Sequence, residues 1–219
     1  MNTIFTKIFD APPFDKKEIL RYAGAKESTP EIAELIESCI EEVKDKLSYK
    51  VCYGHFPVSV KGNMADLSFM ETESESLAKN LARCRSIILF GATVGIEIDR
   101  LISRYGRISP SRALIFQAIG AERIESLCDE FTRFIQKEYG TTVPRFSPGY
   151  GDLSLEAQKD FFRVLEPSKR ICLTLNESML MTPTKSVTAI IGITDEACEE
   201  LKRNCNDCNK TDCMYRRAL

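Results

Sequence analysis

Residues 145–152, Arg-Phe-Ser-Pro-Gly-Tyr-Gly-Asp, place a cation, a turn signal and an aromatic hydroxyl close together. Pro148 fixes its own φ angle and Gly149 tolerates a positive one, so the pair predicts a tight turn. Such a turn exposes backbone N–H groups and lets a ligand approach the main chain closely. Arg145 can hold a carboxylate through two parallel hydrogen bonds. These residues alone fit both a ligand-binding turn and a surface turn with Arg145 in solvent.

The second group of chemically competent residues lies near the end of the chain: Cys198, Cys205, Cys208 and Cys213. The spacing Cys-x2-Cys-x4-Cys among polar neighbours can bind zinc or an iron–sulfur cluster, with Cys198 as a fourth ligand. A redox-active or disulfide pair is a second interpretation, and no role is a third. We therefore treat 195–219 as a cysteine-rich tail outside the main domain.

The long segment before the turn must position Arg145. Ser109-Pro110 is typical of a helix start, and an apolar stripe continues to about Tyr139, before Gly140. A helix of this length would span roughly 45 Å and serve as a central scaffold. Its middle turns carry four acidic residues, Glu122, Glu125, Asp129 and Glu130. A solvated face is the simplest interpretation of each.

Periodicity elsewhere predicts the remaining elements. Apolar residues at helical spacing predict helices over 15–22, 30–47, 74–84, 96–105 and 155–165. We expect an irregular segment over 1–14, a hairpin within 50–70 around Gly62-Asn63, and strands over 86–90, 170–175 and 186–193. This order predicts an α+β fold, with a twisted, largely antiparallel sheet and one long helix, in a single domain over 1–194.

Composition narrows the class of protein. The 219 residues carry a net charge of −2, which disfavours binding to nucleic acid or an anionic membrane. No apolar run approaches 18 residues and no charged-then-apolar leader is present, so we expect a cytoplasmic protein. Nine cysteines without a leader argue against a secreted disulfide scaffold. Five of them lie in periodic segments and are expected to be buried: Cys39, Cys52, Cys84, Cys128 and Cys172.

Two stretches carry a resemblance to a known family. The pattern Arg-x-x-Pro-Gly-Tyr over 145–150 resembles the S-adenosylmethionine-binding signature of the activation domain of cobalamin-dependent methionine synthase. The segment 175–187 resembles that family's Leu-x-Glu-Ser-x-x-Met-x-Pro…Ser-Val stretch. The resemblance covers most of the chain and is strongest over 145–192. Large relatives carry this domain as their last module, whereas this chain resembles the stand-alone, split form.

The resemblance implies a subunit that supports reductive methylation of cob(II)alamin with S-adenosylmethionine. Cobalamin would come from a separate methionine synthase subunit, and the electron from a flavodoxin or ferredoxin. Cobalt(I) is a strong nucleophile and the sulfonium methyl is already activated, so orientation replaces a general base. The alternatives are a reductive activator of another corrinoid methyltransferase, or a metal- or redox-binding module that uses the C-terminal cysteines.

The resemblance also implies roles for individual residues. Arg145 would bind the methionyl carboxylate, and backbone groups around Ser147 and Gly149 would hold the polar edges of the ligand. Tyr150 would lie where the ligand meets the corrin. Asp10 begins an Asp-x-x-Pro-Phe outline and would bind the ammonium group.

Family contacts on the last strand fall on Ile191 and Gly192, where the large enzymes carry aromatic residues. This chain also has Gly151-Asp152 in place of a Pro-Ala-Cys-Pro run after the signature.

Overall fold

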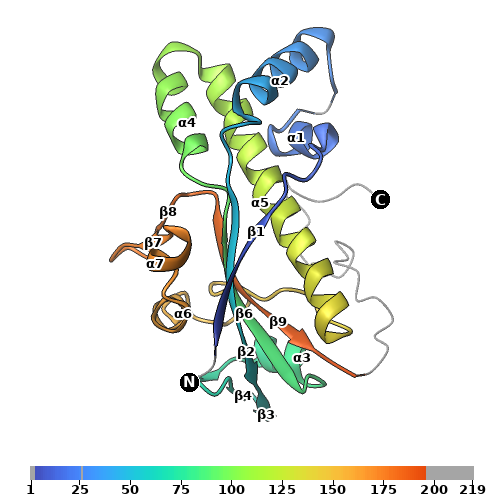
Figure 1. Ribbon diagram of the computed structural model, residues 1–219, viewed down its shortest axis with the longest axis vertical. Helices are drawn as coiled ribbons and strands as arrows, with labels where there is room; N and C mark the ends of the chain where they lie inside the picture. Colours follow the sequence, from blue (N-terminus) through green and yellow to red (C-terminus); the bar gives the residue numbers. More distant parts are fainter. Residues whose placement is uncertain (1–2, 26, 196–219) are drawn as a thin grey trace.

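The computed structural model describes residues 3–25 and 27–195 (Figure 1). The helices are α1 (Lys16–Tyr22), α2 (Pro30–Val43), α3 (Glu75–Leu81), α4 (Glu97–Ile108), α5 (Pro110–Tyr139), α6 (Ala157–Leu165) and α7 (Pro167–Ile171). The strands are β1 (Ile4–Phe9), β2 (Tyr49–Pro57), β3 (Ser59–Lys61), β4 (Met64–Asp66), β5 (Glu71–Glu73), β6 (Ser86–Thr93), β7 (Thr174–Leu175), β8 (Met181–Thr182) and β9 (Ser186–Ile193).

The main sheet has four strands in the order β1-β2-β6-β9, and each neighbouring pair is antiparallel. Both β6 and β9 are apolar and buried along most of their length, because helices cover both faces of the sheet. Two small sheets accompany it, β3-β4-β5 and β7-β8. The predicted α+β class with a largely antiparallel sheet is therefore confirmed.

Helix α5 forms the scaffold that the sequence predicts. It begins at Pro110 and ends at Tyr139, with Gly140 at φ +100° after it. Its C-terminal half packs on one face of the main sheet, where Phe131 contacts the Phe90 ring at a centroid distance of 4.8 Å. Its N-terminal half extends beyond the sheet and packs against α1, α2 and α4 (Figure 1).

The opposite face of the sheet is covered by α3, α6 and α7. Side chains from these helices, including Leu77, Phe161 and Ile171, form one core with the inward residues of β2, β6 and β9. The segment after α5 runs beside the outer edge of β9, because Phe146 and Ile190 exchange backbone hydrogen bonds of 2.8 and 2.9 Å. This edge places the turn at 147–152.

Several sequence-based expectations need correction. Residues 4–9 form β1, not an irregular segment, because their backbone pairs with β2 from Ile4↔Gly54 to Phe9↔Tyr49. The hairpin expected around Gly62-Asn63 is present as β3 and β4, but the region 50–70 also contains most of β2, a longer strand that was not expected. The expected strand over 170–175 shrinks to β7, because α7 continues to Ile171. Cys172 then adopts a φ of +58° and is exposed, unlike the buried Cys39, Cys52 and Cys128.

None of the helices in the described part of the chain combines the length and apolar character needed to cross a membrane.

Candidate functional site

The turn after Arg145 has the predicted geometry. Tyr150 N donates to Ser147 O at 3.1 Å, with Pro148 and Gly149 between them and Gly149 at φ +85°. Proline at the second position and glycine at the third are typical of such a turn. Gly149 N also donates to Leu153 O at 2.9 Å, so this N–H is already paired within the turn.

Asp152 fixes the turn to the start of α3. Its carboxylate accepts hydrogen bonds from Ser74 Oγ at 2.5 Å, from Glu75 N at 2.8 Å and from Ser76 N at 3.2 Å. The hydrogen bond from Ser74, followed by those from the backbone, lowers the pKa of Asp152 to about 2. Gly151 lies so close to Ser76 that an added Cβ would approach its Oγ to 2.5 Å. The turn is therefore held in place by a helix N-terminus.

Arg145 lies against the middle of α5. Its Nη1 contacts Asp129 Oδ1 at 2.6 Å and donates to Thr132 Oγ1 at 3.1 Å, and its Nη2 contacts Glu125 Oε2 at 3.0 Å. The Arg145 side chain is 7% exposed, whereas those of Glu125 and Asp129 are 36% and 51% exposed. The guanidinium is thus buried and oriented, while its acidic partners remain open to solvent.

The C-terminal end of helix α1 lies near Glu125. Burial raises the pKa of Tyr22, and the Glu125 carboxylate raises it further. The Tyr22 ring lies against the Arg21 guanidinium, 4.2 Å from its centroid. Glu125 therefore lies within the electrostatic reach of both Arg145 and the end of α1.

The N-terminal segment is fastened to α5 by a buried ion pair between Glu122 and Arg123. Arg123 donates to Pro12 O at 2.5 Å and to Pro13 O at 2.7 Å, and its guanidinium lies 4.0 Å from the centroid of the Phe14 ring. Both charged side chains are almost completely buried. Because β1 ends at Phe9, this anchor also fixes the position of the exposed Asp10.

A cavity of about 610 Å³ opens between this segment and α5. Its wall includes the 12–17 segment on one side and Ser126, Asp129 and Arg133 on the other. Asp129 lines the cavity and also binds Arg145. The Asp129 carboxylate therefore lies between this cavity and the Arg145 guanidinium.

Tyr150 lies on the α6 side of the β9 edge, away from α5. Arg145 packs toward α5, whereas its neighbour Phe146 packs into the core on the α6 face, since consecutive residues beside a strand point to opposite faces. The Tyr150 ring lies 6.4 Å from the Phe146 ring and is 65% exposed. The structure therefore brings Arg145 together with the α5 carboxylates and leaves Tyr150 on the opposite face.

Ile191 and Gly192 are buried in the last strand. Ile191 belongs to the core beneath α5. An added Cβ on Gly192 would approach Val143 Cγ2 to 2.8 Å and Leu81 Cδ2 to 2.9 Å, and would also collide with Cys84 Sγ. In this structure both residues serve packing, so a ligand contact here would involve the backbone or a local rearrangement.

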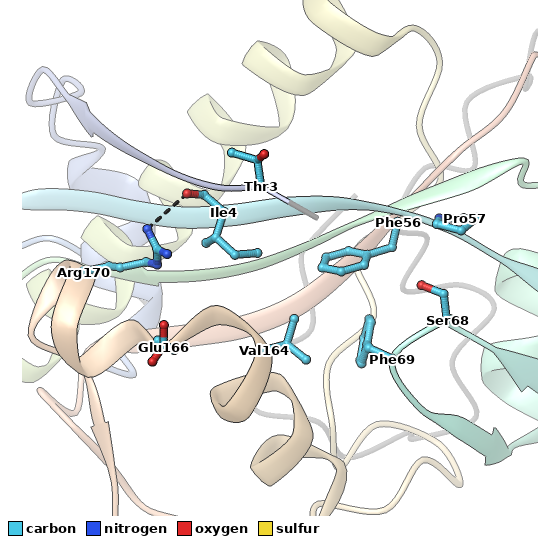
Figure 2. A pocket seen from close by; sticks show the side chains of 9 residues that line it. All are labelled: Thr3, Ile4, Phe56, Pro57, Ser68, Phe69, Val164, Glu166 and Arg170. Carbon is cyan, nitrogen blue, oxygen red and sulfur yellow. Dashed lines mark hydrogen bonds between the residues drawn. The ribbon is translucent and has the colours of Figure 1, made fainter. Parts of the chain in front are cut away.

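Two further cavities lie on the face opposite α5. The larger, about 730 Å³, has an apolar floor that includes Phe56, Phe69 and Val164, and Figure 2 shows Arg170 at its rim. Arg170 donates to Ile4 O at 3.1 Å, so its charge is used to hold β1 (Figure 2). The smaller, about 390 Å³, adjoins the turn at Ser147.

The predicted cysteine ligands Cys198, Cys205, Cys208 and Cys213 lie outside the described residues. Within 3–25 and 27–195, no group of three or more His, Cys, Asp or Glu side chains is arranged to hold a metal ion.

One feature of the sequence could have identified the partners of Arg145. Glu125 and Asp129 are four residues apart on a helix and therefore share one face, which also carries Thr132. Glu122 lies one turn earlier on the same side but is buried with Arg123, and Glu130 pairs with Arg133 at the surface.

Comparisons with known proteins support the fold. No family model matches the chain, and no curated protein does. Among solved structures, the chain is similar to the MetH reactivation domain in its crystal structure bound to AdoHcy, with a TM-score of 0.61 and 14% identity. The match covers 89% of this chain and 79% of that one. The chain therefore has the mixed α+β fold, with antiparallel sheets and several helices, that the MetH reactivation domain adopts.

Proposed function

We propose that this chain binds S-adenosylmethionine and acts as the activation subunit of a separate cobalamin-dependent methionine synthase. The observation that carries the proposal is the buried Arg145 guanidinium beside Glu125 and Asp129, in the fold of a domain crystallised with AdoHcy. AdoHcy is what remains of S-adenosylmethionine after methyl transfer. The sequence signature over 145–150 points to the same ligand.

The charges at this site complement the ligand. Arg145 with Glu125 and Asp129 carries a net charge of −1. S-adenosylmethionine carries a sulfonium, an ammonium and a carboxylate, which sum to +1 at neutral pH. A carboxylate can take the Arg145 fork, while the two acidic side chains hold the cationic groups. Asp10, at the end of β1, would add a further acceptor for the ammonium.

In this reaction the main task of the protein is to orient the methyl donor. One electron from a donor such as a flavodoxin or ferredoxin reduces the cobalt(II) of the substrate to cobalt(I). The cobalt(I) electron pair then takes the methyl group, so that the S–CH₃ bond breaks as the Co–CH₃ bond forms and S-adenosylhomocysteine leaves. In this scheme the chain binds the methyl donor, aligns it and excludes water. The cobalamin-binding subunit supplies the corrinoid.

Calorimetry tests the ligand. Arg145→Ala should weaken S-adenosylmethionine binding by about 1.5–3 kcal/mol, or roughly 10- to 150-fold, the range for a lost charged hydrogen bond. Arg100→Ala is the matched control, because Arg100 pairs with Glu97 on the exposed surface of α4. If the unmodified protein binds no S-adenosylmethionine, or Arg145→Ala binds it equally well, the proposal fails.

The partner requires a second experiment. Purified chain is added to a cob(II)alamin-loaded methionine synthase that lacks its last module, together with S-adenosylmethionine and reduced flavodoxin. We expect the visible spectrum to convert to that of methylcobalamin only when the chain is present. Conversion at the same rate without the chain would remove the activating role.

A further inference from the structure

Strand β1 forms a free edge of the main sheet. The strand order is β1-β2-β6-β9, and β2 is the one strand that pairs with β1 in the described part of the chain. The other edge, at β9, is partly covered, because Phe146 and Ile190 exchange backbone hydrogen bonds there. An unpaired edge presents N–H and C=O groups that a further strand can bind.

The pairing register shows which backbone groups of β1 point outward. In an antiparallel sheet the N–H and C=O of one residue point to the same side, and the side alternates along the strand. Ile190 points toward Phe146 and therefore away from its β6 neighbour, Leu89. Leu89 then points toward Gly54 of β2, and Gly54 points away from Ile4. The N–H and C=O of Ile4 consequently point outward.

Thr6 and Ile8 share this orientation, because it repeats at every second residue. The Ile4 carbonyl accepts a hydrogen bond from Arg170 Nη1 at 3.1 Å, which agrees with its outward direction (Figure 2). A carbonyl oxygen has two lone pairs, so Ile4 can accept a second hydrogen bond. Among the described residues, no backbone group pairs with the N–H or C=O of Thr6 or Ile8 on this side.

Apolar side chains at this edge are exposed on both faces of the sheet. Ile8 is 71% exposed on the α6 and α7 face, and Phe5, which contacts Tyr53, is 45% exposed on the α5 face. Lys7 is the one charged residue of β1, and its Nζ lies 4.3 Å from the centroid of the Phe134 ring. An edge strand with exposed apolar side chains and little charge readily pairs with another strand.

We propose that β1 pairs antiparallel with β1 of a second copy of this chain, across a two-fold axis at Thr6, so that the two four-stranded sheets become one. In this register Thr6 lies opposite Thr6 of the second copy, Ile4 opposite Ile8, and Phe5 opposite Lys7. Each outward N–H then meets a carbonyl of the other copy. The exposed Ile8 side chain is covered by Ile4 of the second copy. This pairing requires no ligand.

Charge favours this register over the neighbouring one. A two-fold axis at Lys7 would place two ammonium groups directly opposite each other, and like charges in that position are destabilising. An axis at Thr6 instead brings Lys7 of one copy over the α5 face of the other, beside Phe5. The ring of Phe5 is an apolar and π-rich neighbour for the ammonium group.

Glu138 supplies an opposite charge at the same place. Phe134 lies on the β1 side of α5, because its ring contacts Lys7, and Glu138 is on the same side four residues later. Burial raises the pKa of Tyr53, and the Glu138 carboxylate raises it further, so this carboxylate is near the residue that pairs with Phe5. Neither Lys7 nor Glu138 forms an ion pair within residues 3–25 and 27–195. The two-fold axis would create two such pairs.

Sedimentation velocity over a concentration series tests the pairing. An interface that rests on one six-residue strand is at the small end of protein interfaces, so we expect a dimer that dissociates on dilution. Thr6→Pro removes an outward N–H and leaves the ladder with β2 intact, because proline is tolerated on an edge strand when its nitrogen faces outward. The dimer loses two hydrogen bonds, so association should weaken at least about tenfold.

Thr6→Val is the matched control, because it keeps the N–H and the β-branched shape and should associate as the unmodified chain does. Circular dichroism checks that Thr6→Pro remains folded. Charge reversal tests the register without proline. Lys7→Glu and Glu138→Lys should each weaken association, and the double variant should recover it. Lys79→Glu, on the exposed face of α3, is the control for charge reversal and should have no effect.

Hydrogen exchange gives an independent measurement. The amides of Thr6 and Ile8 should be protected at high protein concentration and exchange freely on dilution. Protection that persists on dilution would mean that residues of the same chain cover the edge, and this would overturn the proposal. A protein that stays monomeric throughout the series also overturns it. So does a dimer that neither Thr6→Pro nor the single charge reversals weaken, because another surface would then hold it together.

Discussion

The buried pair of Glu122 and Arg123 gives the sharpest stability prediction, because it fastens the N-terminal segment to the central helix. Arg123 has 0% of its side chain exposed, and its nitrogen atoms contact Glu122 and two backbone carbonyls, those of Pro12 and Pro13. Arg123→Met keeps a long, unbranched side chain against Phe14 but removes every one of these hydrogen bonds.

The expected loss of stability comes from the Glu122 carboxylate, which stays buried after its partner is removed. The Glu122 carboxylate is 2% exposed and would keep only Ser126 Oγ at 2.7 Å and Asp15 N at 3.3 Å. Removing one member of a buried ion pair costs about 3–5 kcal/mol, because the other charge stays in a medium that solvates it poorly. Domains of this size unfold with about 5–15 kcal/mol, so the variant should lose roughly a fifth or more of its stability.

Urea denaturation followed by circular dichroism measures this free energy of unfolding. Arg100→Met is the control: it breaks an exposed pair with Glu97 and should cost at most about 1 kcal/mol. The double variant Arg123→Met with Glu122→Leu removes both charges and should recover more than half of the loss. A loss below about 1 kcal/mol for Arg123→Met, or a double variant no more stable than the single one, would refute the reasoning.

Two other variants test the packing around the candidate site. Asp152→Asn should destabilise the protein at neutral pH and much less near pH 2. The pKa of Asp152 is lowered in the fold, so its carboxylate stabilises the fold above the ordinary pKa of 3.8 and stops doing so as the pH falls through about 2. A difference in urea midpoint between the variant and the unmodified protein that stayed constant during acid titration would contradict this prediction. Gly192→Ala should cost about 1–3 kcal/mol, because its new methyl would overlap Leu81 and Val143; an unchanged melting temperature would show that the sheet adjusts freely there.

Local signals predicted the long helix well. The bounds of α5 follow from Ser109-Pro110 at one end and Gly140 at the other, and each signal acts within one helical turn. Strand β1 was not predicted, because no local signal marks it. It has exposed apolar side chains on both faces, such as Phe5 and Ile8, and its existence depends on pairing with β2, forty to fifty residues later.

In the candidate site, too, features set by local residues were predicted and features set by distant segments were not. The sequence predicted the turn at Pro148 and Gly149, because both residues restrict or permit particular φ angles on their own. It did not predict that Arg145 and Tyr150 fall on opposite faces, because that depends on how Phe146 registers against Ile190 across the chain. Register between distant segments is set by the burial of whole faces, which no short motif encodes.

The partners of Arg145 also bear on how tightly a ligand can bind. A ligand carboxylate must replace Asp129, since the guanidinium already contacts that residue and Glu125. Asp129 is half exposed, so water can solvate its carboxylate again once the ligand carboxylate pairs with the buried guanidinium. The ligand nonetheless gains only the difference between two ion pairs. The effect of Arg145→Ala on S-adenosylmethionine binding should therefore fall near 1.5 kcal/mol, the lower end of the range for a charged hydrogen bond.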